Sequence, residues 1–371
     1  MFEGRSPMAL TVGIIGLPNV GKSTLLNALA STEAEASNYP FCTIDSNKGV
    51  AAVPDKRLER LAEVINPVDV IPSTITFVDI AGLVKGASRG EGLGNKFLHH
   101  IREADVLAHV LRAFKDSNVS HIQGDIDPEK DLEIIETELF LSDIERVESQ
   151  IAKEKTKTRA QKKKERKDLE FLNEIREKLS RQERINSNDY AHHKRDILSD
   201  LNLLMAKPVI FVINSGEDSG DDEEFKKVLS IIGSKISKEH SVIISAKVES
   251  EISKLPDEEK GEYMEALGID SGAVDKFIEK CHNLLGLIRY YTKAKGKLQA
   301  WSIRDGTMAP RAAGKIHSDM EKGFIRAKVM NSEDLISIGN ENELKNKGLL
   351  RTEGHDYTVR DGDVIEYLFN G

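Results

Sequence analysis

The order of apolar and polar positions divides the chain into three kinds of sequence. From residue 8 to about 114, short apolar runs alternate with helix-like stretches, a pattern typical of a parallel α/β sheet. From 131 to about 204, apolar residues recur every three or four positions among charged ones, which predicts long amphipathic helices. Apolar strand-like runs return at 207–213 and 241–245. We therefore expect the helical segment to be inserted into the α/β domain.

The helical segment contains two apolar stripes with a basic stretch between them. Residues 153–167 hold nine basic and two acidic side chains and almost no apolar ones. This order predicts an antiparallel helical hairpin, a coiled coil, with a basic tip. The apolar positions that define the two stripes are Leu132, Ile135, Leu139, Ile144, Val147 and Ile151, then Leu169, Leu172, Ile175 and Leu179.

After residue 287 the pattern changes to strands with tight turns. Residues 298–303 alternate at period two and are followed by an Asp-Gly pair at 305–306. The runs 357–359 and 364–367 flank a second Asp-Gly pair, which predicts a β-hairpin. We expect a small mixed α/β domain here, mostly sheet. The expected division is an α/β domain of residues 8–130 and 205–286, a helical insertion of 131–204, and a C-terminal domain of 287–371.

Composition narrows the class of protein. The 371 residues carry a net charge of −9, so the whole surface is not expected to coat nucleic acid. Two cysteines, Cys42 and Cys281, cannot form a disulfide framework, which favours a reducing compartment such as the cytoplasm. No apolar run approaches the roughly 20 residues that span a bilayer. Residues 1–7 precede a second methionine, Met8, and are expected to be either an extension of the folded chain or a cloning remnant.

The strongest motif is a phosphate-binding loop of the form GxxxxGKS, from Gly16 to Ser23. It follows an apolar strand and precedes a helix-like run, which is the context that the motif requires. Glycines let backbone N–H groups approach phosphate oxygens, and the helix N-terminus adds its positive dipole end. Lys22 is expected to reach the β- and γ-phosphates. A turn that binds nothing is the alternative, and spacing and context together argue against it. The candidate nucleotide-binding residues of this loop are Asn19, Val20, Gly21, Lys22, Ser23 and Thr24.

A magnesium site is predicted beside the loop. The apolar run 75–78 ends in Asp79, and Gly82 follows three residues later. An acid at the end of a buried strand holds Mg²⁺, often through water, together with the Ser23 hydroxyl. Gly82 is expected to sense the γ-phosphate. Thr43 is the candidate for the switch residue over the ion, the alternative being an ordinary loop threonine.

The base-reading motif departs from that of a GTPase. The strand 209–213 ends in Asn-Ser-Gly-Glu, from Asn214 to Glu217, where a GTPase has Asn-Lys-x-Asp. Glutamate is one methylene too long for the paired hydrogen bonds to guanine, and Asn214 can still bond adenine, so ATP is favoured. Asp218 keeps a guanine interpretation open if the loop shifts by one residue. The base is expected to be backed by the main chain of Ser245, Ala246 and Lys247.

The sequence offers several candidates for the residue that activates the attacking water. Leu83 stands where many P-loop hydrolases carry a glutamine, and leucine cannot orient water. His109 is the catalytic candidate, its alternative being a histidine in the core. Arg89 and Arg112 are weaker candidates for stabilising charge. Asn19 could coordinate K⁺ in place of an arginine finger.

Several stretches together resemble the YchF (Obg-like ATPase) family of P-loop proteins. The glutamate of the base motif is a hallmark that separates this family from true GTPases. The C-terminal stretches 300–307 and 313–326 resemble the family's TGS domain, a β-grasp module. The likeness extends over nearly the whole chain. The other stretches that carry it are 16–24, 38–44, 79–84 and 86–97.

The resemblance implies an ATPase G domain, an inserted helical hairpin and a TGS domain, with the ribosome as partner. Leu83 matches the family's hydrophobic replacement of glutamine, and His109 matches its histidine candidate. Two departures are Leu26, where phenylalanine is frequent, and Ser215-Gly216 within the base motif, which leaves the strictness of ATP selection open.

The expected function is a Mg²⁺-dependent, slow ATPase that acts as a switch on ribosomes. A GTPase that differs only in base choice and a scaffold stabilised by nucleotide are the alternatives. The basic tip is either a solvated helix end or a contact with ribosomal RNA through Lys162, Lys163 and Lys164. It has no interleaved aromatics, so recognition of a DNA or RNA sequence is not expected. We expect a monomer.

Overall fold

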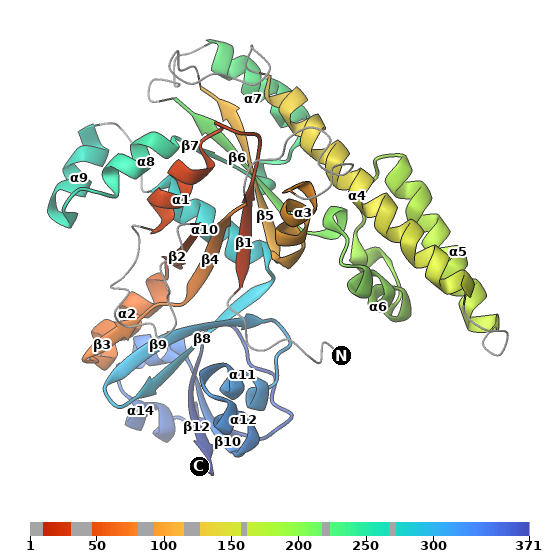
Figure 1. The fold of residues 1–371 in the computed structure, drawn as a ribbon. Coiled ribbons are helices and arrows are strands. Elements are labelled where there is room, and N and C mark those ends of the chain that lie inside the picture. Colours follow the sequence, from red (N-terminus) through yellow and green to blue (C-terminus); the bar gives the residue numbers. More distant parts are fainter. Residues whose placement is uncertain are drawn as a thin grey trace.

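The computed structural model describes residues 10–30, 47–80, 93–114, 127–156, 162–216, 223–266 and 272–370. Two sheets organise these residues, one above the other in Figure 1, with a long pair of helices projecting from the upper one. Thr43, Gly82, Leu83, Arg89 and Glu217 lie outside the described residues.

The first sheet is the predicted α/β sheet. All neighbouring strands run parallel except β2 and β4, which pair antiparallel. Strand β5 is buried along its whole length, as expected of a central strand covered on both faces. In order across the sheet the strands are β2 (Lys48–Ala52), β4 (Thr74–Asp79), β1 (Thr11–Ile15), β5 (Val106–Ala113), β6 (Val209–Ser215) and β7 (Ser241–Ile244).

Helices cover this sheet and share its core. Helix α1 packs beside β2 and β4, α3 beside β1, and α10 beside β6 and β7. The core is aliphatic with a few aromatic rings, such as the contact of Phe77 with Phe277 at 5.5 Å between ring centroids. The helices are α1 (Lys22–Ala30), α3 (Leu93–Glu103), α7 (Glu223–Lys235), α8 (Ala246–Ile252), α9 (Asp257–Ala266) and α10 (Ala273–Leu284), with a short 3₁₀ helix at Lys238–His240.

Two long helices lie between β5 and β6 in the sequence. Helix α4 (Pro128–Thr156) starts beside the sheet and extends away from it, and α5 (Lys162–Ser180) packs along α4 (Figure 1). Every predicted apolar position is buried or packed against the core, so the 3.6-residue pattern is confirmed. Helix α6 (His192–Leu201) and 3₁₀ helices at Ser187–Asp189 and Leu204–Ala206 lead back to the sheet.

The second sheet is covered on both faces. Neighbouring tyrosines of one strand, Tyr290 and Tyr291, belong to two different hydrophobic clusters because successive side chains of a strand point to opposite faces. One cluster contains α11 (Ala309–Ile316), and the other contains α2, α13 and α14. The strands, in order, are β11 (Arg351–Glu353), β10 (Phe324–Asn331), β12 (Asp363–Phe369), β8 (Leu287–Ala294), β9 (Lys297–Arg304) and β3 (Asp69–Ile71); the remaining helices are α2 (Lys56–Ile65), α12 (Ser318–Lys322), α13 (Ser332–Ile338) and α14 (Glu341–Asn346).

The β-hairpin predicted around the second Asp-Gly pair was wrong. Gly362 does adopt a positive φ of 86°, as a turn glycine should, but residues 357–359 form only an isolated bridge, between Thr358 and Met308. Both edges of β12 are already occupied, by β10 and by β8. The Asp363 carboxylate accepts hydrogen bonds from Tyr357 Oη at 2.7 Å and Arg360 N at 2.9 Å, which holds this segment in a turn.

Among the helices of the described ranges, none combines the length and hydropathy that crossing a lipid bilayer requires.

Candidate nucleotide-binding site

The phosphate loop connects β1 to α1, as its motif predicts. Gly16 and Gly21 have φ values of 154° and 96°, and Asn19 is left-handed at 63°. A Cβ on Gly21 would lie 2.2 Å from Asn214 Nδ2, so this position is closed to larger residues by both conformation and space. Because glycine occupies both of these crowded positions, the backbone on the inner side of the loop stays accessible.

Lys22 lies across the loop at the N-terminus of α1. Its Nζ donates hydrogen bonds to the carbonyl oxygens of Gly16 at 3.1 Å and Leu17 at 2.9 Å. Burial lowers the pKa of Lys22, and the nearby Asp79 carboxylate opposes that shift. Because the two acceptors are neutral carbonyls, an anionic phosphate would complete the surroundings of this buried ammonium group.

Ser23 and Asp79 form the candidate magnesium site. Ser23 Oγ donates to Asp79 Oδ2 at 2.5 Å, which joins the start of α1 to the end of β4. The other carboxylate oxygen, Oδ1, is buried and has no hydrogen-bond partner among the described residues. Mg²⁺ prefers one or two carboxylate or hydroxyl ligands together with phosphate oxygens and water. The hydroxyl and the unpartnered carboxylate oxygen fit that ion, and Thr43, the third predicted ligand, lies outside the described residues.

Asn214 makes two hydrogen bonds within the protein that the sequence did not predict. Its Nδ2 donates to Val20 O at 2.8 Å, and its Oδ1 accepts from Ala246 N at 3.0 Å. One Nδ2 hydrogen and one Oδ1 lone pair remain for other partners, so the expected bond to the adenine base stays a prediction. In this structure Asn214 ties the phosphate loop to the start of α8. An asparagine at the carboxyl end of a buried strand was the sequence signal, but the partner atoms were not readable from it.

The segment expected behind the base begins α8. Ser245 is the N-cap residue and its Oγ, although buried, has no partner among the described residues. Ala246 is buried, whereas Lys247 is exposed. The structure thus brings together residues 16–24, Asp79, Asn214 and 245–247, while Gly82 and Glu217 lie outside the described part of the chain.

His109 is a core residue of β5 in this structure. Its side chain is 2% exposed and lies against Phe211, with 5.7 Å between ring centroids. Burial, with help from the positive charges of Arg184 and Lys22, lowers the pKa of His109 to about 3. Its Nε2 has no hydrogen-bond partner among the described residues. The neutral, enclosed ring fits the core alternative better than the catalytic one, which stays a prediction. Arg112 is likewise buried, with its Nε on Phe114 O at 3.2 Å.

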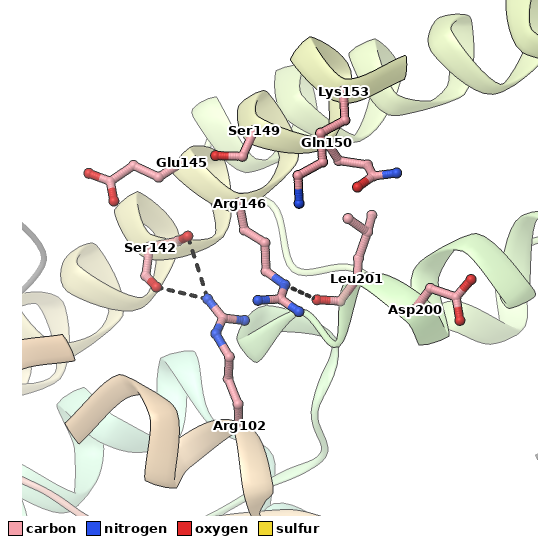
Figure 2. Close-up of a pocket in the computed structure, with 9 residues that line it drawn as sticks. All are labelled: Arg102, Ser142, Glu145, Arg146, Ser149, Gln150, Lys153, Asp200 and Leu201. Carbon is pink, nitrogen blue, oxygen red and sulfur yellow. Dashed lines mark hydrogen bonds between the residues drawn. The ribbon is translucent and has the colours of Figure 1, made fainter. Parts of the chain in front are cut away.

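A separate cavity of about 340 Å³ lies between the second half of α4 and the ends of α3 and α6 (Figure 2). Arg102 Nη2 donates to the Ser142 hydroxyl at 2.8 Å, and Arg146 Nε donates to Leu201 O. Lys153 and Arg146 bring two positive charges to its lining, and Glu145 and Asp200 bring two negative ones. Arg102 is paired with the buried Asp143. The cavity is therefore close to neutral and is distinct from the phosphate loop.

Two family models match the chain, one over the region that contains the phosphate loop and one over the C-terminal domain. A model described as "50S ribosome-binding GTPase" matches residues 11–140. The YchF-GTPase C-terminal model, described as a protein of unknown function, matches residues 287–370. The first match contains the phosphate loop and Asp79, and the second contains five of the six strands of the second sheet.

Whole-chain relatives share both regions. The chain is 44% identical to "Ribosome-binding ATPase YchF" of Bacillus subtilis over 98% of this chain and 100% of that protein. It is 42% identical to the protein of the same name from Escherichia coli O157:H7, with the same coverage. The solved structure of the Schizosaccharomyces pombe YchF GTPase superposes with a TM-score of 0.87 at 35% identity, over 98% of this chain and 99% of that one. Since the similarity extends over the full length in both sequence and fold, the chain belongs to the YchF family of P-loop proteins.

Proposed function

We propose that this protein binds Mg²⁺·ATP at the phosphate loop and hydrolyses it in association with the ribosome. The observation that carries the nucleotide part is the junction of Ser23 with Asp79, 2.5 Å apart, beside a buried carboxylate oxygen that has no partner among the described residues. Lys22 supplies the positive charge for the phosphates. Bound Mg²⁺ would supply charge neutralisation at the β- and γ-phosphates.

The choice of base rests on Glu217 and on the main chain of 245–247. Asn214 bonds to Val20 and Ala246 and so shapes the site, and its second Nδ2 hydrogen is proposed to bond to the adenine base. The printed names of the relatives differ, since the B. subtilis protein is called an ATPase and the S. pombe structure a GTPase. We propose ATP because glutamate at 217 cannot reproduce the paired hydrogen bonds of aspartate to guanine.

Parallel titration of ATP and GTP, with Mg²⁺ present, tests this choice. We expect ATP to bind at least about tenfold more tightly, which corresponds to the absence of one charge-assisted hydrogen bond to guanine. Equal affinities would favour the GTPase alternative. Glu217→Asp is the matched variant and is expected to reduce the preference for ATP.

Hydrolysis is proposed to be slow in the isolated protein because Leu83 cannot orient water. Phosphate release is therefore expected to rise when ribosomes are added. A rate that ribosomes leave unchanged would favour a nucleotide-stabilised scaffold. The same assay with NaCl replaced by KCl tests the proposed K⁺ site at Asn19, and equal rates would contradict it.

The helical insertion is proposed to make the contact with ribosomal RNA. In this division, 8–130 and 205–286 form the G domain except for α2 and β3, which pack with the second sheet; 131–204 form the inserted coiled-coil hairpin, and 287–371 a TGS domain of the β-grasp type. Helices α4 and α5 support this because they project from the first sheet with basic residues towards their far end. Lys162, Lys163 and Lys164 begin α5, and their side chains lie outside the described atoms. We propose a monomer that works in the cytoplasm.

A further inference from the structure

Two neighbouring strands connect the candidate magnesium site to the second sheet. Strands β2 and β4 pair antiparallel, from Lys48 opposite Val78 to Ala52 opposite Thr74. At one end of this pair, Asp79 N donates to Asn47 O at 2.9 Å, so β2 holds the backbone of the magnesium-site carboxylate. We refer to residues 47–53 and 73–79 as the β2–β4 ribbon.

The far end of the ribbon is built into the second sheet. Val53 N donates to Ser73 O at 2.8 Å, which closes the ribbon at that end. Between these two residues the chain forms α2 and β3, and β3 pairs parallel with β9 as an edge strand of the second sheet. Figure 1 shows β2 and β4 descending from the first sheet to α2 and β3, which lie against β8 and β9.

Asp55 is the buried centre of this junction. It caps α2, and its Oδ1 accepts from Arg57 N at 3.1 Å and Leu58 N at 3.2 Å. The Tyr291 hydroxyl, on β8, lies 2.9 Å from Oδ2 and 3.1 Å from Oδ1 of the same carboxylate. Asp55 is 6% exposed and Tyr291 fully buried. A buried carboxylate that is bonded in this way fixes the position of both elements, since removing a partner leaves its charge unsatisfied.

A second set of contacts reinforces the first. Arg57 Nη1 pairs with Asp361 at 2.8 Å, and Arg289 N donates to the same carboxylate at 2.8 Å. Arg289 Nη1 also donates to Pro54 O at 3.0 Å. Burial alone would raise the pKa of Asp361, but its bonds to Arg57 and Arg289 hold the pKa below its ordinary value. A Cβ on Gly362 would lie 2.8 Å from Arg57 Nη1, so the turn that precedes β12 is fitted to α2.

We propose that the β2–β4 ribbon couples the magnesium-nucleotide site to the second sheet, with Tyr291 and Asp55 as the positioning residues of that coupling. A change in the position of Asp79 moves β2 through Asn47, and β2 cannot move without disturbing Asp55. By thermodynamic reciprocity, whatever stabilises one position of the second sheet changes the affinity for Mg²⁺·ATP. This inference rests on the proposed function only for the identity of the ligand.

Hydrogen exchange of the full-length protein, read by peptide, tests the coupling. Without nucleotide, Tyr291→Phe is expected to speed exchange in the Asp79-proximal half of the ribbon, at 47–50 and 76–79, by about fivefold, the lower end of usual coupling factors. With Mg²⁺·ATP, the wild-type protein is expected to slow its exchange at 287–304, and Tyr291→Phe is expected to lose that response. The second variant, Arg57→Gln, breaks a partly exposed contact and is expected to act in the same direction more weakly.

Tyr357→Phe is the matched control. It removes the same hydroxyl from a tyrosine bonded to an aspartate of the second sheet, Asp363, whose carboxylate also accepts from Arg360 N. In Tyr357→Phe the β2–β4 ribbon is expected to exchange hydrogen at the wild-type rate. Unchanged exchange at 47–50 and 76–79 in Tyr291→Phe, or an equal change in Tyr357→Phe, would overturn the coupling. Equilibrium dialysis of ATP with the wild-type protein distinguishes failure of the proposed function from failure of the coupling. Absence of ATP binding refutes the proposed function. ATP binding without slower hydrogen exchange at 287–304 refutes the coupling.

Discussion

Asp79 uses its two carboxylate oxygens differently, and this asymmetry is informative. Oδ2 accepts the Ser23 hydroxyl, whereas Oδ1 is buried with no hydrogen-bond partner in the described part of the chain. Buried polar atoms are almost always satisfied, so an unpartnered one at a predicted metal site points to a bound ion or water. The chemical identity of that group is best tested by removing the charge alone.

Asp79→Asn is expected to weaken Mg²⁺·ATP binding by about tenfold or more, because the amide presents one fewer anionic oxygen to the ion. ATP affinity in EDTA is expected to change by less than about threefold. Calorimetric titration in the two buffers measures both. Asp200→Asn, an exposed carboxylate away from the loop, is the control. An equal loss in EDTA and in Mg²⁺ would mean that Asp79 supports the fold of the loop and not the ion.

His109 leads to a pH prediction with a definite sign. The pKa is about 3 in the folded protein and about 6.5 when the chain is unfolded. The unfolded chain therefore takes up the proton first as pH falls, and the free energy of unfolding drops between pH 6.5 and 3, by about 1 kcal/mol per pH unit from this group. His109→Leu is expected to flatten that slope in urea unfolding at pH 6.5, 5.5 and 4.5.

The same variant decides between the two roles of His109. If the ring is structural, His109→Leu retains ATP hydrolysis within a few-fold of wild type at pH 7.5. A loss of about a hundredfold, with unchanged ATP affinity, would instead support catalysis by His109. His282, whose pKa burial lowers to about 4, is a second source of the same pH slope and remains in both proteins.

Individual residues show where sequence reasoning reaches its limit. The conformation of the phosphate loop and the proximity of Ser23 to Asp79 were predictable because backbone and ion chemistry prescribe residue types at fixed spacing. Asn214 lies at its predicted strand end, but its bonds to Val20 and Ala246 were not predictable, since an amide bonds equally well to a base or to main-chain groups. Only the fold determines which of these comes within hydrogen-bond distance.

At the scale of elements, a buried ion pair attaches the helical insertion to helix α3. Arg102, at the end of α3, donates to Asp143 of α4 at 3.2 Å and to Asn202 O at 2.8 Å. Asp143 is fully buried and also accepts from Leu204 N and Met205 N. These bonds therefore fix α4 and residues 202–205, which lead back to β6, to helix α3.

Arg102→Met is expected to lower the free energy of unfolding by about 3 kcal/mol, because it leaves the Asp143 carboxylate buried without its counter-charge. Arg181→Met removes an arginine from an exposed i,i+4 pair with Glu177 and is expected to cost under about 0.5 kcal/mol. Urea unfolding of the two variants measures the difference. Similar small losses in both would show that Asp143 is satisfied by its two backbone donors alone.

Helices and strands were predictable from the sequence where an apolar pattern repeats over many residues and the element packs against one neighbour. The stripes of α4 and α5 repeat over many turns, so each position indicates the same face. The Asp-Gly turn at 361–362 was locally correct, yet its strand pairs with β10 and β8 instead of 357–359. The pairing of β3 with β9 joins residues more than 200 positions apart, and a three-residue strand carries too little pattern to predict it.

At the scale of the whole molecule, charge is segregated. The chain has a net charge of −9, but residues 153–167 contribute +7, so the other 356 residues carry −16. The described parts of this stretch, residues 153–156 of α4 and 162–167 of α5, lie at the end of the α4–α5 pair that is farthest from the first sheet (Figure 1). A net acidic body with a basic tip favours contact of a polyanion with that tip, which orients the approach to RNA.

Reversal of Lys162, Lys163 and Lys164 to Glu is therefore expected to weaken ribosome binding by about a hundredfold or more at low salt. Removing one ion pair with a phosphate reduces the slope of log K against log salt by about 0.7–0.9, so removing three reduces it by about two to three. Cosedimentation with ribosomes across a salt series measures both quantities. The control reverses three exposed lysines in or next to the C-terminal helices α12 and α14, Lys322, Lys345 and Lys347, which changes the net charge equally and is expected to leave the slope unchanged. Equal losses in the two proteins would mean that overall charge, and not an oriented contact at the tip, governs binding.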